Sequence, residues 1–256
     1  MLIEYPDGES VDLLFDKRLH SYKVGEAVVP SATRVLDIIA KPALVPWALK
    51  VGVGWLEKHI FHDEKSSSKK TNIYKSAMGL DAIIKGVKSA YRSSSKDALN
   101  IGTITHEWVE DAIKWKMEGG EIPTLPKQDE ALNAIDAFRA WVSENNVEWL
   151  SSEEKLYHRK HGYAGTVDAR ANINGEYCVI DWKTSKAVYP EYHLQVAAYA
   201  RAAEDVHGED VDATYILRCD KATGRFEAVR STEIEENFQA FLAALTLYRR
   251  MKEIGR

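Results

Sequence analysis

The chain has 256 residues and a hydrophobic share of 45%, which is enough for one large domain with a packed core and excludes wholesale disorder. Its two cysteines have no Cys-x-x-Cys partner, which excludes a zinc ribbon and a disulfide framework and suits a reducing, cytosol-like compartment. The net charge of -5 hides a local imbalance, because residues 65–96 hold eight basic side chains and one acidic side chain.

The sequence gives no sign of a membrane protein. The first ten residues are acidic and lack the apolar segment of a signal peptide. No apolar run approaches the length of a membrane-spanning helix. We therefore expect a cytoplasmic protein with no membrane partner.

The first hundred residues are expected to open with short strands and to continue with helices. Turn residues, proline positions and apolar spacing delimit these segments. The expected elements are strands at Val11–Phe15 and Tyr22–Val29, a helix over Ser31–Ile39 capped by Ser31, a helix over Trp47–His62, a polar loop over residues 63–72, a basic helix over Ile73–Tyr91, and a break at Ser93–Ser95.

The remainder alternates between strong helical periodicity and strand-like runs. Gly119 and Gly120 end the first of these helices, and Thr232-x-x-Glu235 has the spacing of a capping box. The expected elements are helices over Asp97–Met117 and Lys127–Glu144 (Leu132, Ile135, Phe138 and Val142 inward), strands at Val147–His158, Gly165–Ile173 and Glu176–Lys183, a helix over Pro190–Val206, a hairpin of Ala213–Cys219 and Phe226–Arg230 around Lys221–Gly224, and a last helix. This order predicts an α/β fold of the α+β type, in which helices flank a central mixed sheet.

One predicted hairpin brings charged residues together. Asn174-Gly175 is a strong signal for a two-residue turn, which pairs residues whose numbers sum to 349. Asp168 and Asp181 would then face each other, with Cβ atoms roughly 4.5–5.5 Å apart. Two carboxylates at that distance repel each other unless a divalent cation lies between them. Lys183 lies two residues after Asp181 and therefore on the same face.

An ordinary salt bridge on a surface hairpin is the alternative interpretation of these residues. The tripeptide acid-x-Lys is by itself a weak signal, because it also occurs at Asp63–Lys65 and Glu153–Lys155. Only Asp181-Trp182-Lys183 follows an apolar strand and has a second acid across a turn. This context favours a metal site.

Several further motifs flank this pair of aspartates. In chain order they are Gly102–His106, Glu154 before Leu156-Tyr157, Gly165–Asp168, Val179–Ser185 and Gln195–Tyr199. Their order and spacing resemble the PD-(D/E)XK nuclease superfamily, and within it the RecB-like branch of phage-type and mitochondrial genome maintenance exonucleases. The resemblance covers residues 96–206, with a weaker likeness around Val29–Thr33, Pro42 and Trp47. Asp181 stands where glutamate is commoner in the superfamily.

The resemblance implies a restriction-endonuclease-like core with a mainly helical N-terminal extension. Residues 1–95 are then expected to be an accessory, DNA-contacting region and residues 96–256 the nuclease core, with one continuous structural domain as the alternative. The implied activity is Mg²⁺-dependent hydrolysis of DNA, with an exonuclease favoured, in phage or bacterial recombination, repair or processing.

The same resemblance implies a role for each site residue. Asp168, Asp181, Lys183 and Gln195 would be catalytic. The metal ligands would be His106, Glu154, Asp168, Asp181 and the backbone carbonyl of Trp182. One or two Mg²⁺ ions are expected, with Mn²⁺ as a substitute, because the site is rich in carboxylates. Glu153 is an alternative to Glu154, and a satisfied core histidine is the alternative reading of His106.

DNA contacts are expected outside this site. Lys85, Lys88 and Arg92 share one face of the basic helix, where lysines on a solvated surface are the alternative. Tyr199 would touch DNA unless it is an ordinary packing residue. Tyr74 and Tyr91 are further candidates for stacking on unpaired bases.

The expected partner is DNA that is single-stranded or has accessible ends. The resemblance also allows a homo-oligomer and a recombination or single-strand-binding protein as a partner. Two other functions remain open: a structure- or sequence-specific endonuclease on the same core, and a nuclease that has lost catalysis and only binds nucleic acid.

Overall fold

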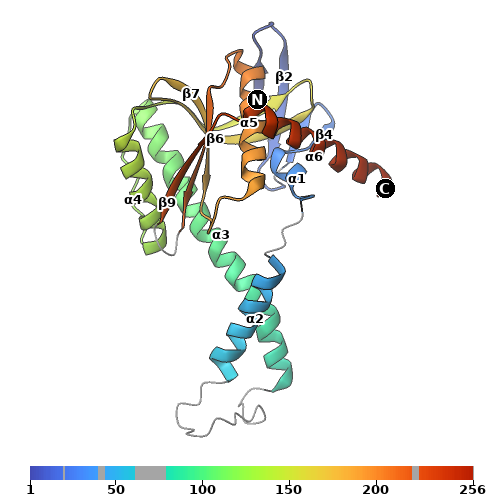
Figure 1. Ribbon diagram of the computed structural model, residues 1–256, viewed down its shortest axis with the longest axis vertical. Helices are drawn as coiled ribbons and strands as arrows, with labels where there is room; N and C mark the ends of the chain where they lie inside the picture. The colour runs from blue at the N-terminus through green and yellow to red at the C-terminus, as the bar shows by residue number, and fades with distance from the viewer. Residues whose placement is uncertain (20, 40–43, 61–78, 221–224, 256) are drawn as a thin grey trace. The chain divides into compact units, whose positions relative to one another are not determined.

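The structure is a computed structural model and describes residues 1–19, 21–39, 44–60, 79–220 and 225–255 (Figure 1). The chain divides into two compact units. We call residues 1–39 with 101–256 the sheet unit, and residues 40–100 the helical unit. This division differs from the predicted accessory region of residues 1–95, because the first 39 residues join the sheet unit. The Tyr5 hydroxyl, for example, donates a hydrogen bond to the Tyr157 carbonyl at 2.8 Å.

A five-stranded mixed sheet forms the centre of the sheet unit. Its strands follow the order β5-β6-β7-β8-β9, and all neighbours are antiparallel except β7 and β8. Helix α5 (Pro190–His207), with its proline in the first turn, links the two parallel strands. The bounds are β5 Val147–His158, β6 Tyr163–Ile173, β7 Glu176–Lys183, β8 Ala213–Cys219 and β9 Phe226–Ser231. The predicted fold class, a mixed sheet flanked by helices, is confirmed.

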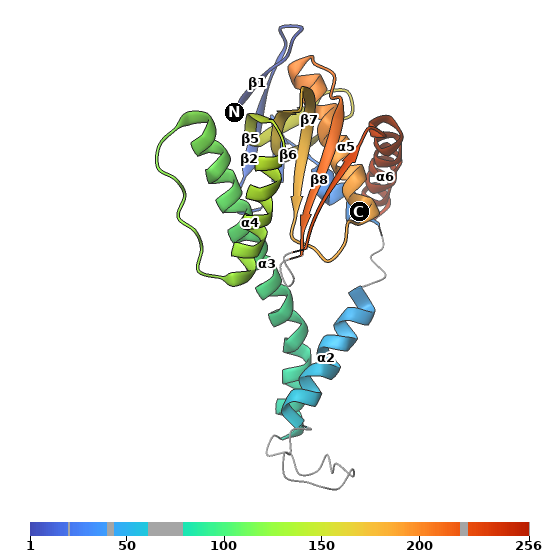
Figure 2. The same cartoon turned by 60° about the vertical axis from the view of Figure 1, so that its left-hand side comes forward.

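Helices cover both faces of this sheet (Figure 2). Helices α5 and α6 (Ile234–Ile254) pack on one face, and α4 (Asp129–Glu144) packs on the other. Side chains of β7 alternate between the two cores: Tyr177 and Val179 join the core under α5, and Ile180 joins the core under α4. Because side chains alternate along a strand, Asp181 lies on the same face as Tyr177 and Val179, which is the face covered by α5.

Two of the four inward positions predicted for α4 are buried. Ile135 and Phe138 are buried, whereas Leu132 and Val142 are only half-buried. Trp141 takes the buried position that the prediction gave to its neighbour Val142. The helix is thus rotated slightly from the orientation that its apolar spacing suggested.

Residues 1–29 form a four-stranded antiparallel sheet in the order β1-β2-β3-β4. The expected strand over Tyr22–Val29 is wrong as a single strand, because Gly25, at φ 58°, turns the chain back on itself. The bounds are β1 Leu2–Glu4, β2 Ser10–Asp16, β3 Ser21–Val24 and β4 Ala27–Val29. The expected extension is therefore not mainly helical at its start.

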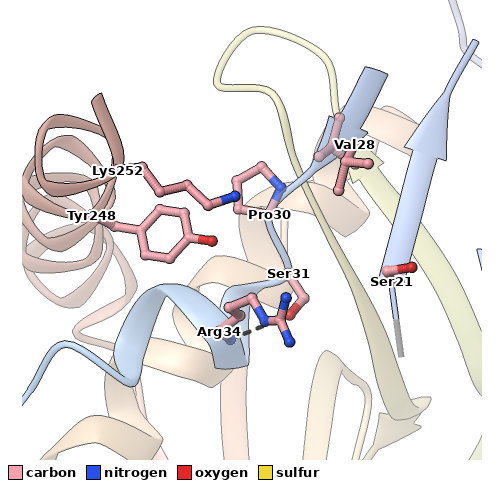
Figure 3. Close-up of a pocket in the computed structure, with 8 residues that line it drawn as sticks. Ser21, Val28, Pro30, Ser31, Arg34, Tyr248 and Lys252 are labelled. Carbon is pink, nitrogen blue, oxygen red and sulfur yellow. Dashed lines mark hydrogen bonds between the residues drawn. The ribbon is translucent and has the colours of Figure 1, made fainter. Parts of the chain in front are cut away.

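Helix α1 (Ala32–Leu36) follows this sheet and has the predicted N-cap. The Ser31 hydroxyl accepts a hydrogen bond from the Arg34 backbone N–H at 3.2 Å. Figure 3 shows the pocket beside this cap, into which Tyr248 and Lys252 of α6 point. Its volume is only about 20 Å³, room for a single water. This pocket is too small for a substrate.

Two predicted helix ends are wrong. Helix α3 (Leu80–Glu118) continues through Ser93–Ser95, because serine costs a helix only a few tenths of a kcal/mol and the segment holds no proline. Helix α6 begins after Glu233 without a side-chain cap, since the Glu235 carboxylate accepts from Arg201 and Gln239 instead. The end of α3 before Gly119 is confirmed.

Helix α2 spans Leu44–Ile60, close to its predicted bounds. The predicted polar loop over residues 63–72, the start of the basic helix and the turn at Lys221–Gly224 lie outside the described residues. Among the helices that the structure describes, none combines the length and apolar character needed to cross a membrane.

Candidate functional site

The hairpin of β6 and β7 has the register that its turn predicts. Asn174 and Gly175 both have positive φ angles, 54° and 90°, as a tight hairpin turn requires. Partners then sum to 349 from Ile173↔Glu176 to Ala169↔Ile180. Asp168 and Asp181 come next on the two strands. The Asp168 Oδ2 atom accepts a hydrogen bond from the Trp182 N–H at 2.6 Å, which fixes this carboxylate at the end of the ladder.

Asp181 is 1% exposed and is held from two sides. Its carboxylate forms an ion pair with the Lys183 ammonium. Its Oδ1 atom accepts a hydrogen bond at 3.2 Å from Gln195 on α5. The structure therefore brings Asp168, Asp181, Lys183 and Gln195 together, with Asp181 and Gln195 buried and Asp168 and Lys183 half-buried.

Three side chains from three different elements offer ligand atoms to one point. His106 of α3, Glu153 of β5 and Asp168 of β6 each have a nitrogen or oxygen atom within 4.8 Å of the other two. We call these three residues the acid cluster. The His106 Nδ1 atom lies 3.9 Å from Asp168 Oδ1. A Cβ atom on Gly102 would lie 2.9 Å from the Thr184 hydroxyl, so this glycine lets α3 approach the end of β7.

Burial and nearby charges shift the pKa values of the residues in the acid cluster. Burial, together with the Asp181 carboxylate, raises the pKa of Asp168 to about 8. Burial and the Asp168 carboxylate raise the pKa of Glu153 to about 7. Burial and the Lys183 ammonium lower the pKa of His106. The two carboxylates of the acid cluster and the neighbouring Asp181 carboxylate thus lie close together in a partly buried space, an arrangement that a cation would stabilise.

The Lys183 ammonium responds to the same charges in the opposite sense. Burial lowers its pKa, but the carboxylates of Asp181 and Asp168 outweigh that effect and raise it. The nitrogen also lies 5.0 Å from the centre of the Tyr192 ring. Lys183 is therefore held as a fixed positive charge beside the acid cluster.

The donor set of the acid cluster fits a hard divalent cation. Two carboxylates and one imidazole are within reach of a common point, and the surplus negative charge needs compensation. Two of these three donors are carboxylate oxygens, the ligand type that hard divalent cations prefer. The Trp182 backbone, whose carbonyl is expected to be a further ligand, lies close enough to the His106 ring to oppose the lowering of the His106 pKa.

Glu154, expected in the metal site, is not placed there. Its carboxylate accepts hydrogen bonds from Arg170 at 2.6 Å and from His207 at 2.8 Å. Arg170 also donates to the Tyr177 hydroxyl at 2.9 Å. We call Glu154, Arg170, Tyr177 and His207 the paired cluster. The alternative residue, Glu153, is the glutamate that belongs to the acid cluster.

A local irregularity of β5 explains this exchange. The register of β5 against β6 shifts between Trp149 and Ser151. Glu153 then adopts a φ angle of 50°, which non-glycine residues rarely do. Neither feature has a signal in the sequence, so the regular alternation of a strand could not choose between the two glutamates.

Tyr199 is not on the surface, where a DNA contact would require it. It is 4% exposed, and its hydroxyl accepts a hydrogen bond from Gln195 at 2.9 Å. A Cβ atom on Gly165 would lie 2.4 Å from the Tyr199 ring, so this glycine makes room for the ring against β6. The side chain therefore packs and positions Gln195, which matches the packing interpretation.

The expected DNA-contacting side chains of the basic helix belong to the helical unit. Lys85, Lys88 and Arg92 are exposed on α3. The side chain of Tyr91 and all of Tyr74 lie outside the described residues. Glu110, a residue of the sheet unit to which the sequence analysis assigned no role, lies one turn after His106, and its charge raises the pKa values of Asp168 and Glu153. Its spacing of four from His106 was the available signal.

Comparisons with known proteins give no family assignment. No family model and no curated protein matches the chain. The crystal structure of SSO0001 has 14% sequence identity and a TM-score of 0.33, over 59% of this chain and 74% of that chain. An alkaline exonuclease (LHK-Exo) from Laribacter hongkongensis has 14% identity and a TM-score of 0.29, over 58% of this chain and 84% of that chain. Its complex with dAMP has the same identity and TM-score, over 62% and 91%. TM-scores this low carry no argument about function.

Proposed function

We propose that this chain is a divalent-metal-dependent nuclease that hydrolyses phosphodiester bonds of DNA. The observation that carries the proposal is the acid cluster, His106, Glu153 and Asp168, beside the ion pair of Asp181 and Lys183. Surplus carboxylates next to a fixed ammonium group suit a reaction in which negative charge on a phosphate is bound and then increases.

The acid cluster would hold the cation, with Asp181 and the Trp182 carbonyl as additional oxygen ligands. One or two Mg²⁺ ions, or Mn²⁺ in their place, are the expected cofactors. A bound ion of this kind polarises the phosphate and lowers the pKa of a water molecule. Hydrolysis then adds water across a P–O bond, leaving a phosphate monoester on one product and a hydroxyl on the other.

Lys183 would bind the phosphate during this reaction. Its ion pair with Asp181 fixes the ammonium group at the edge of the acid cluster. The charge therefore needs no rearrangement when negative charge develops on the phosphate oxygens. Gln195 would act as a positioning residue, because it donates to Asp181 and also to the Tyr199 hydroxyl.

Within this class we favour an exonuclease in DNA recombination, repair or processing. The preference rests on the Gly102–His106 motif, whose helix brings His106 to Asp168. The experiment below distinguishes this exonuclease from two rival functions: an endonuclease on the same core, and a DNA-binding protein without catalysis.

The test is digestion of end-labelled DNA, single- and double-stranded, linear and circular, with Mg²⁺ and with a chelator. We expect Asp181→Ala and Lys183→Ala to lower the rate at least about a hundredfold. The matched controls are Asp210→Ala and Lys186→Ala, which remove exposed charges from the same unit and should leave the rate unchanged.

Each result separates two functions. Circular DNA that survives while linear DNA is degraded establishes an exonuclease, and cleaved circles establish an endonuclease. DNA that is bound but not cleaved with Mg²⁺ or Mn²⁺ establishes a binder. Equal rates for the wild type and both site variants would overturn catalysis at this site.

A further inference from the structure

An aromatic pair lies in the helical unit, far along the sequence from the acid cluster. The Trp55 and His59 rings of α2 stack with their centres 4.3 Å apart and their planes at 16°. The His59 Nδ1 atom lies 2.9 Å from the Trp55 carbonyl, a hydrogen bond that fixes the imidazole over the indole. His59 is exposed and Trp55 is half-buried. The pair therefore presents a rigid ring to solvent.

Helix α3 supports the Trp55 ring from the other side. A Cβ atom on Gly86 would lie 2.0 Å from this ring, which means that the indole lies against the backbone of α3. Any side chain at position 86 would displace it. A flat aromatic surface is thus held in place by a glycine rather than by a deep core.

A groove between α2 and α3 runs beside this pair. Its volume is about 460 Å³, within the range of small-molecule sites. One wall carries Trp55, Lys58 and His59, and the other consists of small residues such as Ser89 and Ser93.

The described side chains of the helical unit carry a positive net charge, and one of the basic residues, Lys58, lines the groove. The described side chains of the helical unit include five basic residues, against Glu57 and Asp81 as the acidic ones. Lys85 precedes Ser89 by one helical turn and therefore lies on the groove-lining face of α3. The basic residues are Lys50, Lys58, Lys85, Lys88 and Arg92.

We infer that the groove of the helical unit binds unpaired DNA, with a base stacked on the Trp55–His59 pair and phosphates on Lys58, Lys85 and the neighbouring basic residues. This inference rests on the proposed function and names its substrate as a single strand. Aromatic rings bind any base through its face, while basic side chains follow the backbone. Bases in a duplex are already stacked on their neighbours and do not offer that face.

The test measures binding without cleavage. A labelled oligothymidylate of about 16 nucleotides, a length that spans one such site, is titrated with the full-length protein in EDTA, and anisotropy and intrinsic tryptophan fluorescence are recorded. We expect the single strand to bind more tightly than a duplex of equal length and to quench tryptophan emission.

Two variants test the stacked pair. His59→Ala removes an exposed ring, and Trp55→Leu removes the indole. Each should weaken single-strand binding about 5- to 100-fold, the range for the loss of one stacked base. Trp55→Leu should also lose the quenching. Trp115→Leu, which replaces a half-buried tryptophan of the sheet unit, is the matched control and should bind as the wild type does.

The outcomes are distinct from those of the nuclease test. Single-strand affinity that is unchanged in His59→Ala and Trp55→Leu, or equal affinity for duplex and single strand, overturns the groove as the binding site. If His59→Ala, with unchanged helical circular dichroism, loses affinity, the inference stands even where Trp55→Leu fails to fold. Lys183→Ala should lose hydrolysis and keep this binding, so catalysis and the groove fail separately.

Discussion

Two adjacent glutamates, Glu153 and Glu154, enter two clusters of opposite character. Glu154 belongs to the paired cluster, where Arg170 and His207 occupy both of its oxygens. Burial raises its pKa, but the hydrogen bond with His207 and the charge of Arg170 outweigh that effect and lower the pKa to about 2. Burial and the Asp168 carboxylate instead raise the pKa of Glu153 to about 7.

The difference separates a polar cluster that stabilises the fold from one that is prepared for a ligand. Buried charges in native proteins are paired, because an unpaired charge costs several kcal/mol. The paired cluster obeys this rule with its own side chains. The acid cluster does not, since its two carboxylates repel each other and the neighbouring ammonium group of Lys183 is already paired with Asp181. It lacks positive charge, which the proposed divalent cation would supply.

The largest expected effect is on activity, and Glu153→Gln produces it. Loss of one carboxylate from the acid cluster should lower the rate of Mg²⁺-dependent DNA hydrolysis about a thousandfold, or ~4 kcal/mol of transition-state stabilisation. The free energy of unfolding without Mg²⁺ should stay the same or rise, because a repelling charge is removed. Calorimetry with and without Mg²⁺ measures the second effect: the ion should raise the wild-type melting temperature and leave the variant unchanged.

Glu148→Gln is the control for this change, because Glu148 is an exposed acid of the same strand. It should keep both the activity and the response to Mg²⁺. If Mg²⁺ raises the melting temperature of Glu153→Gln as much as that of the wild type, Glu153 is not a metal ligand. The proposed functional difference between the two glutamates would then be wrong.

Glu154→Gln should lower the stability of the fold and leave the activity nearly unchanged, the reverse of Glu153→Gln. Arg170 is only 9% exposed and would lose its counter-ion, which costs about 3 kcal/mol or more of unfolding free energy. The hydrolysis rate per folded molecule should change little. Denaturant unfolding measures the loss, and the response of the melting temperature to Mg²⁺ should persist.

The exposed ion pair of Glu176 and Arg230 gives the matched comparison. These side chains are 39% and 40% exposed, so Glu176→Gln should cost less than about 1 kcal/mol. A loss as small as this in Glu154→Gln would mean that the paired cluster contributes no more than a surface salt bridge.

The sequence was sufficient for the part of the site that a local signal controls. Asn174-Gly175 sets the turn, the turn sets the register, and the register brings Asp168 next to Asp181. Helix α5 followed from Pro190 and the spacing of its apolar residues, and this placed Gln195 over the sheet. Each step depends on a few neighbouring residues.

Features that depend on distant contacts or on backbone irregularities could not be predicted from the sequence. The choice between the two glutamates depends on the register shift of β5 and on a left-handed backbone at Glu153. The grouping of residues 1–39 with the sheet unit depends on contacts such as that between Tyr5 and Tyr157, 152 residues apart. The expected break at Ser93–Ser95 failed because a run of serines lowers helix stability without preventing the helix.

The smallest expected effect concerns His158, a buried group that belongs to neither cluster. Burial, against the attraction of Asp205 and with the repulsion of His161 and Lys160, lowers its pKa to about 4. The unfolded chain takes up this proton near pH 6.5 and the folded protein does not, so acid favours the unfolded state as the pH falls from 6.5 towards 4. By pH 5 this should remove about 2 kcal/mol of unfolding free energy.

His158→Phe keeps the ring that stacks on Phe238 and removes the titration. Its stability should therefore fall about 2 kcal/mol less than that of the wild type between pH 7 and pH 5, as urea unfolding at both pH values would measure. Parallel losses in the two proteins would show that the imidazole is protonated without cost, and that a buried charge outside the two clusters finds its compensation in Asp205.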